Sequence, residues 1–153
     1  MGDFARQVRN FNLKTERRAS RFVRTLSLEF LTLVVTASPV DTGRYRANHQ
    51  VTLDRLTGEE VFAFDRSGAA TISRGAEELA RFRLGQTVHI GNNVGYPYAL
   101  EFRRRGDGGL WSAQAPAGVY RVSWQRLLSR IESMNIEGGA CAVNRCAPCW
   151  KRN

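Results

Sequence analysis

The sequence predicts a single α+β domain in which a long N-terminal helix and two shorter helices pack on a small, mostly antiparallel sheet. Apolar residues recur every three or four positions through the first 37 residues and alternate with a period of two in later segments. The connections between these segments resemble turns rather than crossover helices, which favours antiparallel pairing. We place the domain at 1–135 and a Cys-containing tail at 136–153, where Gly, Cys, Pro and basic residues replace the apolar pattern.

The first predicted element is a helix over 4–37. Its main apolar stripe comprises Phe4, Val8, Phe11, Ala19, Phe22, Val23, Leu26, Phe30, Leu33, Val34 and Ala37. Leu28, Leu31 and Val35 form a second apolar strip on the later half. A helix that is apolar on two sides is usually buried on two sides. The strip therefore predicts either contact with a neighbouring subunit or a position under the sheet of the same domain. Asn10 and Asn12 are candidate kink positions.

A turn and a strand are expected next. Pro39 ends the helix, because the residue before a proline disfavours helical angles, and 39–43 are typical of a turn. Residues 44–53 alternate as a strand, with Arg44 and Arg46 on one face and Tyr45 and Val51 on the other. We expect a loop over 56–60, a second strand over 61–64 and a turn over 65–68.

The remaining chain predicts two more helices and one strand. A helix over 71–83 has Gly85 as its C-terminal cap, and a strand over 86–91 has Val88 and Ile90 pointing inward. A short helical turn over 98–102 leads into a basic loop over 103–109 and an extended segment over 111–116. The last helix covers 117–134, with Pro116 just before it.

The chain is strongly basic. Its net charge is +9, and only Lys14 and Lys151 of its 23 basic residues are lysines. The arginine excess fits either interface ion pairs and phosphate binding or a GC-rich genome. The charge itself predicts affinity for nucleic acid or an acidic protein surface. No run of about 18 apolar residues predicts a membrane span, and no signal core follows the first basic residues, so we expect assembly in the cytoplasm.

Cysteines and histidines offer the candidate metal and catalytic groups. Cys141, Cys146 and Cys149 contain the CxxC spacing of a zinc half-site, but no fourth ligand lies nearby in sequence. Incidental thiols in a reducing compartment are the favoured interpretation. His49 and His89 lie on predicted strands without a nucleophile motif. We therefore expect packed or exposed histidines, no cofactor and no enzyme activity.

Three segments carry a family resemblance. They are PVDTGRYRAN at 39–48, IGNNVGYPYALEF at 90–102 and QAPAG at 114–118. In this order, within about residues 15 to 130, the chain resembles the neck or tail-completion proteins of long-tailed bacteriophages, the lambdoid head–tail joining group. The RRRGDGGLW link at 103–111 is longer than the usual one, and the Cys-rich tail has no counterpart in that family.

The resemblance implies a structural virion protein without catalytic residues. Such a subunit would form a six-fold or twelve-fold ring, with the head–tail connector and the tail terminator or tail tube as partners, and would line the DNA passage. The alternative is a basic nucleic-acid-binding module, which the charge favours. An enzyme ranks third.

Several residues are candidate contacts in such a ring. Arg44 and Arg46 could meet acidic groups of a neighbour or DNA, or form a solvated strand face. We expect one ring of the pair Tyr96 and Tyr98 in the core and the other at an interface. Glu101 is a candidate partner for an arginine, including one across a subunit boundary. The dense charge of Arg103, Arg104 and Arg105 could face DNA phosphates, an acidic partner or solvent.

Overall fold

The computed structural model describes residues 2–102 and 112–133. Its elements are, in chain order, α1 (Gly2–Ala37), α2 (Arg44–Ala47), β1 (His49–Leu53), α3 (Ala69–Ala80), β2 (Val88–Asn92), α4 (Pro97–Phe102) and α5 (Tyr120–Ser133). Strands β1 and β2 form one antiparallel sheet, with His49 opposite Asn92 and Leu53 opposite Val88. The predicted α+β class is confirmed.

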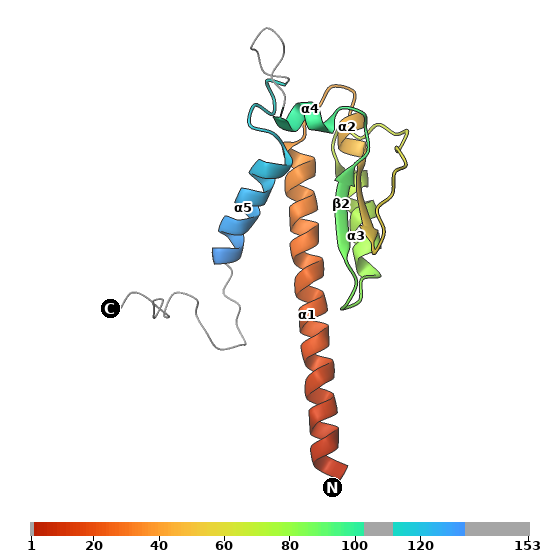
Figure 1. Cartoon of the computed structure of the whole chain (residues 1–153), viewed down its shortest axis with the longest axis vertical. Helices are drawn as coiled ribbons and strands as arrows, with labels where there is room; N and C mark the ends of the chain where they lie inside the picture. Colours follow the sequence, from red (N-terminus) through yellow and green to blue (C-terminus); the bar gives the residue numbers. More distant parts are fainter. Residues whose placement is uncertain (1, 103–111, 134–153) are drawn as a thin grey trace, which may run out of the picture.

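Helix α1 is the axis of the molecule (Figure 1). Its 36 residues give it a length of about 54 Å, and it continues without interruption through Asn10 and Asn12. The second half lies between α5 on one side and the sheet with α3 on the other (Figure 1). The first half projects beyond the domain, and every residue from 3 to 18 is exposed. We call residues 2–18 the N-terminal arm.

The core consists of two clusters on opposite sides of α1. One cluster contains Val34, Tyr45, Val94, Leu100, Ala115 and Val119, with Phe30, Ala37 and Tyr120 packed against it. The other contains Leu31, Val35, Val51 and Leu79, with Leu28, Ile72, Val88 and Ile90 packed against it. The second apolar strip of α1 is therefore covered by α3 and the sheet of the same chain. Its candidacy as a subunit interface was wrong.

The strand predicted over 44–53 is present only from His49 onward. Gly43 has a φ of +91°, which glycine adopts without steric cost. The N–H of Ala47 donates to the carbonyl of Gly43 (2.9 Å), so 44–47 close into the helical turn α2. Arg44 and Arg46 therefore do not share a strand face, and that expectation was wrong.

Three other boundaries differ from the predictions. Residues 61–64 are not a strand. Helix α3 ends at Ala80, so Gly85 lies in the following turn rather than at the cap. Residues 112–118 form turns instead of an extended segment, and α5 begins at Tyr120.

The basic loop with Arg103, Arg104 and Arg105, and the tail with its three cysteines, lie outside the described residues. So does the domain boundary at 135. Within the part that is described, no helix is both long and apolar enough to cross a membrane.

Candidate assembly interface

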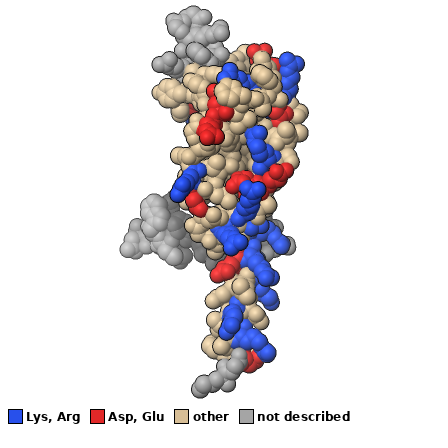
Figure 2. Space-filling view, turned by 90° about the vertical axis from the view of Figure 1, so that its right-hand side faces the viewer, with Lys and Arg blue, Asp and Glu red and all other residues tan. Residues whose placement is uncertain are grey.

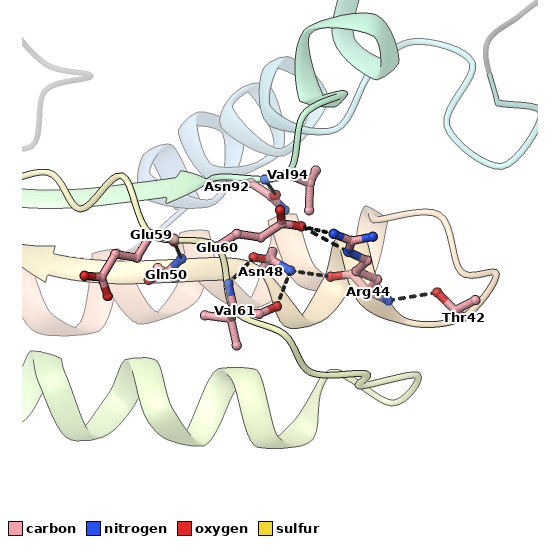
Figure 3. Close-up of polar contacts among 9 residues, drawn as sticks. All are labelled: Thr42, Arg44, Asn48, Gln50, Glu59, Glu60, Val61, Asn92 and Val94. Atoms are coloured by element: carbon pink, nitrogen blue, oxygen red, sulfur yellow. Dashed lines mark hydrogen bonds and ion pairs between the residues drawn. The ribbon is translucent and has the colours of Figure 1, made fainter.

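Asn48, from the first motif, lies at the centre of a buried polar network (Figure 3). The residue is 0% exposed. Its amide oxygen accepts the N–H of Val61 (2.7 Å), and its amide nitrogen donates to the carbonyls of Val61 (2.8 Å) and Arg44 (3.0 Å). One side chain thus satisfies both backbone groups of Val61, as a neighbouring strand would. This explains why 61–64 pack beside β1 without joining the sheet.

Arg44 has its acidic partner within the same chain. Its Nε donates to Glu60 Oε1 (3.0 Å), and a terminal nitrogen lies 2.7 Å from the same oxygen (Figure 3). The guanidinium carbon also lies 5.9 Å from the centre of the Phe62 ring. Arg44 therefore holds the segment between β1 and α3 against α2. Its guanidinium was expected to pair with an acidic group of a neighbouring subunit, but it pairs with Glu60 of its own chain.

Arg46 binds the end of α1. Its guanidinium donates to the carbonyls of Arg66 (2.5 Å), Ser38 (3.0 Å) and Thr36 (3.4 Å). A cation at the C-terminal end of a helix also interacts favourably with the helix dipole. These bonds give Arg46 a structural role at the junction of α1 and the loop before α3.

The second motif continues the network from the end of β2. Asn92 donates to the carbonyl of Tyr45 (2.7 Å) and accepts the N–H of Val94 (3.2 Å). Asn93 donates to the carbonyls of Thr57 (2.9 Å) and Glu59 (2.8 Å). Both asparagines connect β2 to segments that are more than thirty residues earlier in the chain.

Glu101 caps the N-terminus of α5. Its carboxylate accepts the N–H groups of Val119 (2.7 Å), Tyr120 (3.1 Å) and Arg121 (2.8 Å). A Cβ at Gly118 would lie 2.8 Å from that carboxylate, which explains the glycine there. Glu101 was expected to pair with an arginine side chain, but the structure uses it for backbone donors of its own chain.

Gln114 completes the set of motif residues. It pairs with both backbone groups of Val40, accepting from the nitrogen (2.8 Å) and donating to the oxygen (3.1 Å). The three motif segments therefore meet at the end of α1 where α2 and α4 lie (Figure 1). Together they form a hydrogen-bonded framework that connects the three segments, which we call the motif framework.

His49 is part of the buried core beside this framework. The hydroxyl of Ser38 donates to the carbonyl of Val34 (2.7 Å), so His49 Nε2, 2.6 Å from that hydroxyl, acts as the donor. His49 Nδ1 then accepts from the Tyr120 hydroxyl (2.9 Å). Burial, together with the charge of Arg46, lowers the pKa of His49 to about 3.

The geometry of Ser38 and His49 is structural rather than nucleophilic. The histidine donates to the serine instead of taking its proton, and both residues are buried. His89 lies on β2 opposite Thr52, away from this pair. In the described ranges, no three His, Cys, Asp or Glu residues are grouped to hold a metal ion.

An apolar hollow of about 620 Å³ opens beside the framework, between α1, α4 and α5. We call it the aromatic cleft and define it by Phe30, Tyr98, Phe102, Tyr120 and Trp124. Tyr98 is 65% exposed, Phe102 62% and Trp124 51%. Tyr96, in contrast, stacks on the buried Tyr45 ring (5.8 Å between centroids). Tyr96 is itself 37% exposed and belongs to neither core cluster, so the expectation of one tyrosine in the core was wrong. Phe102 and Trp124 were not singled out as contacts.

The N-terminal arm carries a second uncovered apolar surface. Phe4, Val8 and Phe11 follow each other at helical spacing and are 76%, 42% and 68% exposed. We call these three residues the arm stripe. Their periodicity was visible in the sequence, but the sequence did not show that the domain ends before reaching them.

Comparisons with protein-family models, with curated proteins and with solved structures found no match for this chain.

Proposed function

We propose that the chain is a structural ring subunit at the head–tail joint of a long-tailed bacteriophage. In that role it joins the connector to the tail and leaves a passage for DNA. The order of the three motif segments supports this proposal through their resemblance to neck and tail-completion proteins. The hydrogen-bonded motif framework is consistent with a subunit whose work is geometric.

The observation that carries the proposal is the presence of two different uncovered apolar surfaces on one protomer. The arm stripe cannot reach the cleft of its own chain, because Phe11 and Phe30 lie on one uninterrupted helix, about 28 Å apart. The arm of one copy can instead enter the cleft of the next. Contacts between two different surfaces are heterologous, and they close into a ring when the rotation allows it.

The area involved is modest for one junction. Six large side chains form the exposed parts of the two surfaces: Phe4, Val8, Phe11, Tyr98, Phe102 and Trp124. Five of them are aromatic, and a fully buried aromatic side chain covers about 150–250 Å². At these exposed fractions, covering all six buries roughly 600–700 Å² per junction, below the ~1,200 Å² of stable interfaces. A ring subunit makes two such junctions, and ring closure adds effective concentration. We therefore expect cooperative assembly that depends on protein concentration.

Sedimentation velocity and native mass spectrometry of the purified chain test the proposal. We expect one discrete closed species at high concentration, and a monomer for the double variant Phe4→Ser with Phe11→Ser. The matched control, Leu56→Ser with Phe64→Ser, removes two exposed apolar side chains from another surface and should assemble normally. A wild-type chain that stays monomeric at millimolar concentration, or an arm variant that assembles like wild type, would refute the proposal.

A further inference from the structure

A basic hollow lies where the N-terminal arm leaves the domain. Its volume is about 560 Å³, and it is lined by Glu16, Arg17, Ser20, Arg21, Arg24, Phe82, Arg83 and Leu84. Four arginines, three from α1 and one from the turn after α3, thus line one hollow, and Glu16 is its one acidic lining residue. We call Arg17, Arg21, Arg24 and Arg83 the arginine cluster.

The position of the cluster follows from the periodicity of α1. Lys14, Arg17, Arg21 and Arg24 recur at spacings of three and four, so they share one face of the helix. Leu28, Leu31 and Val35 continue the same face. This face is apolar where α3 and the sheet cover it and basic where they end. Figure 2 shows the blue side chains gathered along the part of α1 below the domain.

Within the part of the chain that the structure describes, the charges of the cluster lack carboxylate partners. Among residues 2–102 and 112–133, no carboxylate forms an ion pair with any of its four guanidinium groups. Arg24 donates to the carbonyl of Phe82, which connects α1 to the turn after α3. The Nε of Arg24 is buried and has no acceptor among the described residues. A buried donor costs free energy until a water or a ligand oxygen satisfies it.

The geometry points to a binding site for the phosphodiester backbone of DNA. Guanidinium groups suit phosphate oxygens because their planar forks donate paired hydrogen bonds. Arg17, Arg21 and Arg24 are about 6 Å and about 4.5 Å apart along the helix, so the row can follow successive anions of one strand. Ser20 adds a hydroxyl donor within the hollow. One protomer supplies all these groups, so the inference does not depend on ring formation.

The test is fluorescence anisotropy of a labelled 20-base-pair duplex with the full chain, repeated at several salt concentrations. The triple variant Arg17→Gln, Arg21→Gln, Arg83→Gln removes three charges from the hollow and keeps Arg24, which binds Phe82. The matched triple variant Arg55→Gln, Arg66→Gln, Arg126→Gln removes three exposed charges elsewhere. Circular dichroism confirms that both variants keep the wild-type fold.

We expect wild type to bind the duplex, with an affinity that falls steeply as salt rises. The cluster variant should lose at least about 30-fold in affinity at low salt, and its slope of log K against log salt should be smaller by about 2 to 3. The control variant should lose less than about 3-fold. Equal losses in the two variants, or no duplex binding by wild type, would overturn the inference. Preferential binding of a poly-glutamate peptide of equal charge would assign the hollow to an acidic protein and overturn it as well.

Discussion

Several motif side chains replace backbone partners in this fold. Asn48 pairs with both polar groups of Val61, and Gln114 does the same for Val40. Glu101 accepts three N–H groups at the start of α5. Asn48 and Gln114 thus replace hydrogen bonds that a neighbouring strand would supply, whereas Glu101 replaces the partners that the first N–H groups of a helix lack. Each of the three motif segments contributes one such residue: Asn48, Glu101 and Gln114.

His49 provides the clearest pH dependence at the level of one residue. Its pKa is lowered to about 3 by burial and by Arg46, so the folded chain holds it neutral. An unfolded histidine takes up a proton near pH 6.5. The stability contribution is complete above pH 6.5 and is lost as pH falls from 6.5 towards 3, because only the unfolded chain binds the proton in that window.

We therefore predict that the free energy of unfolding falls by about 1.5 kcal/mol between pH 6.5 and pH 5. His49→Gln should abolish this part of the pH dependence, whereas His89→Gln should leave it in place. Urea denaturation at a series of pH values measures both. A pH dependence in His49→Gln that equals that of wild type would show that another group is responsible.

The roles of single residues were only partly predictable. The expectation that either Tyr96 or Tyr98 lies in the core failed, because Tyr96 stacks on the Tyr45 ring while remaining exposed. Arg44, Arg46 and Glu101 were recognised as important, but their partners lie in segments that no local pattern connects to them. A pattern can indicate that a charge needs a partner; only the folded chain shows that the partner is its own backbone or Glu60.

At the level of elements, α1 was the most predictable part of the chain. Its length and its two stripes follow from a periodicity that is sustained over more than thirty residues. The segment at 44–53 was harder, because alternation over four residues also fits a single helical turn. Gly43 decides between them through its positive φ. The strand expected at 61–64 failed because Asn48 takes the place of a neighbouring strand.

Helix α5 depends on its cap at Glu101. We predict that Glu101→Ala lowers the free energy of unfolding by about 2 kcal/mol, because three N–H groups lose a charged acceptor. Glu132→Ala, at an exposed position of the same helix, should change it by less than about 0.5 kcal/mol. Denaturation in urea compares the two variants, and equal losses would contradict the capping role.

At the level of the whole molecule, α1 contributes to three regions of the structure. Its second half holds both core clusters, its first half presents the arm stripe, and the arginine cluster lies at the point where the two halves meet. The sequence contains all three patterns. What it does not contain is the place where the domain stops covering the helix, because that depends on how far α3, the sheet and α5 reach along it.

The account depends most on the claim that the arm of one subunit binds the cleft of another. The direct measurement is native mass spectrometry of an arm variant, Phe4→Ser with Phe11→Ser, mixed with a cleft variant, Tyr98→Ser with Phe102→Ser. Each variant alone should be monomeric. At high protein concentration the mixture should give a weakly bound one-to-one heterodimer and nothing larger, since only one intact arm and one intact cleft can meet and no ring can close. A cleft variant that assembles by itself would contradict the claim, because it would mean that the arms pair with each other.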